Sequence, residues 1–203
     1  MARPSTQVQR RADILAAASR LMERHDQALL RLADIAAELE LTPNAVRYYY
    51  DDIDELLAAL LERSIERFYN ARLAALDNLD DAGERLAVTI ATGLPTDAED
   101  AEWRVIWRAI LAAGFELNHR PEINSNYHRQ VDLYAGIFEY GARTGRFRLS
   151  GSPLELGRTI MSLEDYLGYR IVARDPMLSR ADGLRLVRGY AELATSSTLP
   201  DGA

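Results

Sequence analysis

The amino-acid sequence predicts an all-α protein with about nine helices: an N-terminal three-helix head that contains a helix-turn-helix, followed by a larger helical bundle. Helix-start signals recur along the chain, and no segment shows the alternation of apolar and polar residues that a half-buried strand would need. The 203 residues, 48% of them hydrophobic, suffice for both parts. We expect one domain over residues 1–50 and a second over residues 51–203.

The head is predicted from three consecutive helical segments. Residues 9–24 place apolar side chains along one stripe, and residues 32–50, LADIAAELELTPNAVRYYY, indicate two short helices joined by a tight turn. The hydroxyl of Thr42 can cap the second short helix, and Pro43 suits its first position because the missing N–H would be unpaired there. Val46 then points into the core of the head.

The second short helix leaves three side chains facing outward: Asn44, Arg47 and Tyr48. Asn can bond adenine and Arg can bond guanine through two hydrogen bonds, while Tyr can reach phosphates. This pattern favours DNA binding. Taken alone, this segment is also compatible with an ordinary helical hairpin that does not bind DNA, because such hairpins are common in α-helical proteins.

The remaining helices are predicted from their start and stop signals. Asp52 and Glu55 form the pattern of a capping box before a long amphipathic helix that leaves the head. Gly145 and the Asp175–Pro176 pair supply stops. Further helices are expected to open at Asp81 with Glu84, Thr96 with Glu99, Pro121 with Glu122, Ser152 with Pro153 and Glu155, and Ser179 with Asp182.

Residues 10–60 resemble the head of the TetR family of bacterial transcriptional regulators. The resemblance rests on the Ile35–Ala36 pair, the turn at Glu40–Leu41, the capping Thr42 and the aromatic cluster Tyr48–Tyr50. The body is similar to betaine-regulator-type members of that family, through Trp103, Trp107, residues 127–134, GARTGRFRL and EDYLGYRIVARDP. The chain departs from the family pattern at Arg31, Glu40, Arg47 and Ile53, where a capping Thr or Ser, a turn Gly, a Tyr and a Lys are usual.

The resemblance implies a ligand-responsive regulator that binds a palindromic double-stranded DNA operator as a homodimer, acts as a repressor and is released by a small-molecule effector. DNA contacts are expected from Arg10, Arg11, Arg31, Thr42, Pro43, Asn44, Arg47, Tyr48 and Tyr49. The dimer would form through the last two helices, over residues 153–174 and 180–194. The second helix would supply the stripe Leu184, Val187, Ala191 and Ala194, although both helices could instead complete a monomeric core.

An effector site is expected where aromatic residues gather in the body: Trp103, Trp107, Phe115, Tyr127, Tyr134 and Phe138. Aromatic residues at helical spacing also serve as ordinary core. Glu164 falls on an apolar face, and a buried carboxylate needs a partner, for which Arg104 or Arg108 are candidates. Without such a partner, a carboxylate among Trp and Tyr rings would suit a cationic ligand.

Charge and composition exclude several function classes. The net charge is −7, yet residues 1–50 carry seven Arg against six acidic residues, which leaves the head weakly basic at +1. The chain has no Cys, no phosphate-binding loop and no nucleophile elbow, and Glu116 with His119 gives the Glu-x-x-His metal spacing only once. We therefore expect no enzyme activity, no cofactor and no metal.

The location and the alternative function complete the expectations. No apolar stretch approaches membrane-spanning length, and charged residues stand where a signal peptide would be apolar, so a cytoplasmic protein without a membrane partner is expected. The alternative is a helical ligand-binding or protein-interaction module that has lost specific DNA binding. Glu40, Ile53 and the acidic run from Asp51 to Glu55 keep that alternative open.

Overall fold

The computed structural model describes residues 4–24, 30–113 and 121–201, and all of its regular elements in these ranges are helices. The predicted all-α class with about nine helices is confirmed. The helices are α1 (Pro4–Arg24), α2 (Leu32–Glu38), α3 (Pro43–Arg47), α4 (Ile53–Ala75), α5 (Ala82–Ala91), α6 (Ala101–Ala113), α7 (Pro121–Arg143), α8 (Pro153–Val172) and α9 (Arg180–Thr195).

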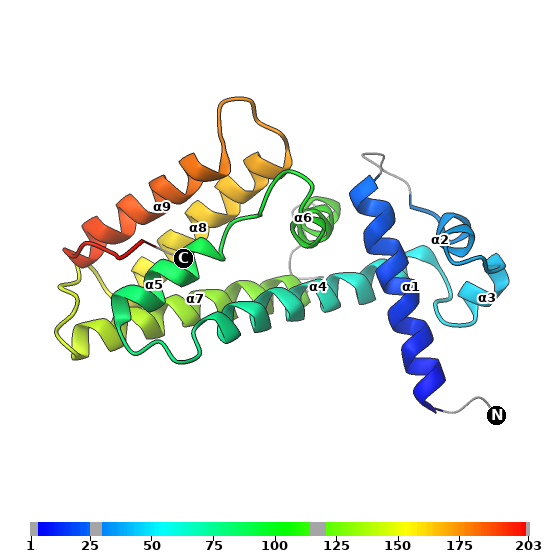
Figure 1. Ribbon diagram of the computed structural model, residues 1–203, viewed down its shortest axis with the longest axis horizontal. Helices are drawn as coiled ribbons and strands as arrows, with labels where there is room; N and C mark the ends of the chain where they lie inside the picture. The colour runs from blue at the N-terminus through cyan, green and yellow to red at the C-terminus, as the bar shows by residue number, and fades with distance from the viewer. Residues whose placement is uncertain (1–3, 25–29, 114–120, 202–203) are drawn as a thin grey trace.

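The helices form an elongated molecule with the head, α1–α3, at one end (Figure 1). Helix α4 runs from the head along α7 into the body, where α5, α8 and α9 pack together. Helix α6, seen end-on in Figure 1, lies between α1 and α8 and contacts both of them. The head therefore meets the body through α4 and α6, and Ile123 at the start of α7 joins the core of the head.

Local chemistry explains the helix boundaries in the head. The Thr42 hydroxyl accepts a hydrogen bond from the Ala45 N–H at 3.2 Å, and Pro43 occupies the first position of α3, as predicted. Glu40 adopts a φ of 54° in the turn, a left-handed conformation that costs a non-glycine residue about 1 kcal/mol. At the start of α4, Asp52 accepts from the Glu55 N–H at 2.8 Å. The Glu55 carboxylate accepts from Asp51 rather than from Asp52.

Most predicted starts in the body are also confirmed. Asp81 caps α5, and Ser152 with Glu155 and Ser179 with Asp182 form capping boxes at α8 and α9. The start predicted at Thr96 with Glu99 is wrong, because α6 begins at Ala101. There the Asp100 carboxylate accepts hydrogen bonds from the Thr96 and Trp103 backbone N–H groups, at 3.0 and 3.3 Å.

The described residues form two hydrophobic cores, and the one in the head extends into the body. Ile14, Ile35 and Val46 of the head are fully buried, and they share their core with Leu56 and Leu60 of α4. The same core includes Val105 and Ile106 of α6 and Ile123 of α7. The division predicted at residue 50 stays a prediction, and the head core crosses it.

The stripe predicted on α9 for contact with a second copy of the chain faces the protein's own core. Val187 and Ala191 have no exposed area, and Ala194 is buried beside them. The large apolar side chains that α9 leaves exposed are Leu186 and Leu193, at 45% and 80%. The predicted contact stripe is wrong for these three residues, which complete the protein's own core, the alternative that the sequence left open. None of the described helices is both long enough and apolar enough to cross a membrane.

Candidate functional site

Helix α3 presents the polar side chains that sequence reasoning assigned to DNA. Thr42, Pro43, Asn44, Arg47 and Tyr48 are all exposed, Tyr48 to 73%, whereas Tyr49 is half-buried. The side chains of Asn44 and Arg47 make no hydrogen bond or ion pair with any described residue. Because Val46 is fully buried on the opposite side, this face of α3 is fixed toward solvent.

The three other arginines predicted to contact DNA differ in their surroundings. Arg10 is exposed, and Arg31 is held by Asp34, whose carboxylate lies 3.2 Å from the Arg31 Nε and raises the pKa of that guanidinium. Arg11 is tied into the head: its Nη1 donates to the Tyr49 carbonyl at 2.5 Å, and its guanidinium lies 4.2 Å from the centroid of the Tyr50 ring. Arg11 thus joins α1 to the end of α3.

A cluster of buried polar side chains lies in the body around Arg72 of α4, which is 1% exposed. The Arg72 guanidinium donates to the Gln130 side-chain oxygen at 2.6 Å, to the Tyr134 hydroxyl at 2.7 Å and to the Thr89 carbonyl at 2.8 Å. It also forms an ion pair with Glu164, 3.5 Å away and equally buried. Tyr134 in turn donates its hydroxyl hydrogen to Glu164. This buried cluster connects α4, α5, α7 and α8.

Burial governs the charges of this cluster. Burial raises the pKa of Glu164 to about 7, against the opposing attraction of Arg72. Burial likewise raises the pKa of Tyr134 well above its ordinary value, so the phenol keeps its hydrogen and remains a donor. The neighbouring Asp165 also has a pKa raised by burial, to about 6. Both carboxyls therefore titrate close to neutral pH.

A cavity of about 30 Å³ adjoins the buried cluster. Its wall is mostly apolar and aromatic, and Gly168 keeps α8 close to it, because a Cβ there would lie 2.3 Å from the Trp103 ring. The indole N–H of Trp107 and the Nε of Arg72 are buried without an acceptor. The cavity is lined by Phe68, Arg72, Gly93, Trp103, Ile106, Trp107, Ile110, Asn126, Gln130, Met161, Glu164 and Asp165.

The cavity brings together part of the predicted effector site. Trp103, Trp107 and Glu164 line it, and Tyr134 contacts Glu164 directly. Tyr127 and Phe138 do not line it. Phe138 is fully buried in the body core beside Phe147, and Tyr127 packs at the edge of that core against His128. Phe115, like Glu116 and His119, lies outside the described residues.

The partner predicted for Glu164 needs correction, because Arg72 holds this carboxylate. Arg104, one of the two candidates, instead pairs with Glu99 at 2.8 Å. Sequence reasoning missed Arg72, although a signal was present: Arg72 follows Phe68 by four positions and so continues the apolar face of α4. A charged residue on an apolar face is the same signal that had identified Glu164.

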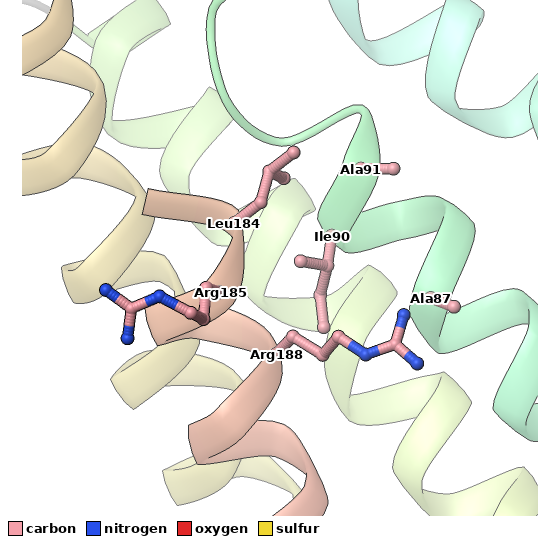
Figure 2. Close-up of a pocket in the computed structure, with 6 residues that line it drawn as sticks. All are labelled: Ala87, Ile90, Ala91, Leu184, Arg185 and Arg188. Atoms are coloured by element: carbon pink, nitrogen blue, oxygen red, sulfur yellow. The ribbon is translucent and has the colours of Figure 1, made fainter. Parts of the chain in front are cut away.

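A second hollow, of about 130 Å³, lies between α5 and α9 (Figure 2). Ile90 of α5 points toward α9 and Arg188 extends toward α5, whereas Arg185 turns away from α5. Leu184, predicted to contact a second subunit, also lines this hollow. Both arginines have partners within the chain: Arg185 pairs with Asp182, and Arg188 pairs with Glu192. The described residues contain no group of His, Cys, Asp and Glu that could hold a metal.

Comparisons with known proteins agree with this geometry. No model of a known protein family matches the chain, and no curated protein matches its sequence. Among solved structures, the chain is 25% identical to a putative transcriptional regulator from Saccharomonospora viridis in complex with choline, with a TM-score of 0.83 over 91% of this chain and 96% of that one.

Two TetR regulators are also similar in structure. One from Haloarcula marismortui has a TM-score of 0.77 at 23% identity, over 97% of this chain and 100% of that one. A putative TetR-family regulator from Rhodococcus sp. has a TM-score of 0.74 at 22% identity, over 92% and 98% of the two chains.

The class of fold follows from the structure: a helix-turn-helix head whose second short helix, α3, is exposed, joined to a helical bundle with a buried cavity. This is the fold of TetR-family transcriptional regulators, and the similar structures support the resemblance that residues 10–60 predicted.

Proposed function

We propose that this protein is a ligand-responsive transcriptional regulator whose head binds DNA and whose effector binds in the cavity beside Arg72 and Glu164. The observation that carries the proposal is the position of α6. Its Trp103 and Trp107 line the cavity, while its Val105 belongs to the core of the head. An effector in the body therefore touches a helix on which the head is packed. The similar solved structures are described as transcriptional regulators, two of them as putative ones.

The size of the cavity explains how binding would reach the head. Sites for small organic ligands usually measure about 300–1,000 Å³, whereas this cavity encloses about 30 Å³. An effector must therefore move the lining helices apart, and α4 and α6 carry both cavity residues and head-core residues. Because interfaces of this kind have discrete arrangements, a small shift of either helix re-aims α3. The effector favours the shifted state only if it binds that state better.

We propose a homodimer on a palindromic operator, because one head binds too weakly. Its net charge of +1 gives little attraction to phosphates, and two linked heads raise the effective affinity. The outer faces of α8 and α9 expose Leu154, Tyr166, Leu186 and Leu193, which we assign to the dimer surface. Two heads about 34 Å apart would meet successive major grooves. Release by the effector makes the protein a repressor that acts on cytoplasmic DNA.

The test is a gel shift with DNA that flanks the protein's own coding region, at low salt. We expect the wild type to bind and Arg47→Ala to lose binding, because Arg47 faces outward from α3 without a partner. Arg185→Ala is the matched control, since this side chain is 71% exposed on α9, outside the head. Light scattering of the same samples reports whether a dimer forms.

The second candidate function is an interaction module without specific DNA binding. It is favoured by the exposed acidic residues Asp51 and Asp52, which follow the recognition helix and repel phosphates. No binding by the wild type at low salt would favour this candidate and overturn the regulator. Equal binding by Arg47→Ala and the wild type would reject the assigned contact face.

A further inference from the structure

We propose that Asp165 is the counter-ion for a small organic cation in this cavity, and that the Arg72–Glu164 pair is a structural frame rather than the ligand's partner. The inference rests on the proposed effector site and names the class of its ligand. It replaces the earlier expectation that Glu164 would meet the cation.

The first step concerns Glu164, whose charge is already balanced inside the protein. Arg72 lies 3.5 Å from it, and Tyr134 donates a hydrogen bond to it. Arg72 is in turn engaged by the Gln130 and Thr89 oxygens. A buried carboxylate with a guanidinium and a phenol as donors has no need of a further cation. The frame is complete without a ligand.

Asp165, the next residue on α8, lines the same cavity and is attracted by Arg72, but that guanidinium is already paired with Glu164. Its side chain makes no hydrogen bond or ion pair with any described residue. Burial raises its pKa to about 6, so it is mostly ionised at neutral pH. Arg72 carries one positive charge, Asp165 is mostly ionised and Glu164, with a pKa of about 7, is partly ionised, so these three lining groups carry between zero and one net negative charge at neutral pH. An unpaired, partly desolvated carboxylate is unfavourable, and a monovalent cation would compensate it.

The rest of the wall selects the kind of cation. The rings of Phe68, Trp103 and Trp107 line the cavity together with apolar side chains. Aromatic rings attract cations through their faces and are the usual surroundings of quaternary ammonium groups, which offer no N–H donors. The unpaired indole N–H of Trp107 can donate to an oxygen on the same ligand. A quaternary ammonium compound with a hydroxyl or carboxylate fits these features, and choline is bound in the similar Saccharomonospora viridis structure.

Calorimetry on the full chain tests the assignment, with choline and its uncharged tert-butyl analogue as probes. We expect the wild type to bind choline, and Asp165→Asn to lose at least about tenfold in affinity because one charge partner is removed. Asp132→Asn is the matched control, since Asp132 is exposed on α7 and does not line the cavity. We expect this variant to bind choline as the wild type does. The tert-butyl analogue should bind the wild type more weakly than choline does.

Several results would overturn the proposal, and gel shifts separate them from failure of the regulator function. Unchanged choline affinity in Asp165→Asn would remove the assigned counter-ion. Equal affinity for choline and its tert-butyl analogue would show that the cavity does not distinguish a cation from an uncharged ligand of the same shape. A wild type that binds DNA but gives no heat with millimolar choline would reject the ligand class while leaving the regulator intact. Retained DNA binding by Asp165→Asn would show that this variant is folded.

Discussion

Replacing Arg72 by Met tests whether the buried cluster holds the body together. The substitution keeps a long side chain but leaves the Glu164 carboxylate, 1% exposed, without its guanidinium. Removing one partner of a buried ion pair costs about 3–5 kcal/mol. For a protein of this size each kcal/mol lowers the melting temperature by about 2–4 °C, so we expect a fall of roughly 6–20 °C. Thermal unfolding followed by circular dichroism measures it.

The loss of stability should depend on pH because the Glu164 carboxylate becomes neutral when it binds a proton. With Arg72 present, burial holds the pKa of Glu164 at about 7, above its ordinary value of 4.5, so the folded state binds the extra proton. Stability from this group is therefore greatest below 4.5 and falls as pH rises toward 7. Without Arg72 the pKa of Glu164 rises further. Arg72→Met should consequently be more damaging at pH 8 than at pH 6.

Two controls make the result decisive. Arg185→Met removes an arginine that is 71% exposed, and it should change stability by no more than about 0.5 kcal/mol. The double variant Arg72→Met with Glu164→Gln should recover much of the loss, because it removes the unpaired charge. A fall in melting temperature no larger than that of Arg185→Met, or a double variant no more stable than Arg72→Met, would refute the reasoning.

Three further predictions concern single positions. Glu40→Gly should raise the free energy of unfolding by about 1 kcal/mol, measured in urea, because φ is 54° there; a loss would contradict strain at this turn. Gly168→Val should lower it by about 1–3 kcal/mol, since a Cβ would lie 2.3 Å from the Trp103 ring. Arg11→Gln should weaken DNA binding without changing how the affinity depends on salt. Arg10→Gln should instead reduce the slope of log affinity against log salt concentration by about one, the contribution of one phosphate contact. Equal slopes for both variants would contradict this distinction.

The helix boundaries could be predicted where their causes lie within a few residues. Thr42 and Pro43 start α3 as predicted, and Ser179 with Asp182 starts α9, because capping involves neighbours in the chain. Thr96 misled the prediction because Asp100 competes for the same role and takes the Thr96 N–H. The general arrangement of a head and a body was also predictable, since it follows from the order of these helices.

The contacts that build the site were harder to predict from the sequence, because they depend on packing between distant segments. Glu164 was identified as an unusual residue, but its partner Arg72 lies 92 positions away on α4. Only the packing of α4 against α7 and α8 decides which arginine reaches it. The same limit applies to α9, where sequence cannot tell which of two apolar sides, Val187 or Leu193, faces the protein's own core.

The shared core of the head has a consequence for exchanging parts between regulators. Val105 and Ile106 of α6 and Ile123 of α7 fill space among residues of α1, α2 and α4. A hybrid that joined residues 1–50 of this protein to a foreign body would place unmatched side chains against that core, at a cost in packing. Specificity for DNA therefore cannot be transferred by moving residues 1–50 alone. A hybrid must also include the stretches of α4, α6 and α7 that pack against the head.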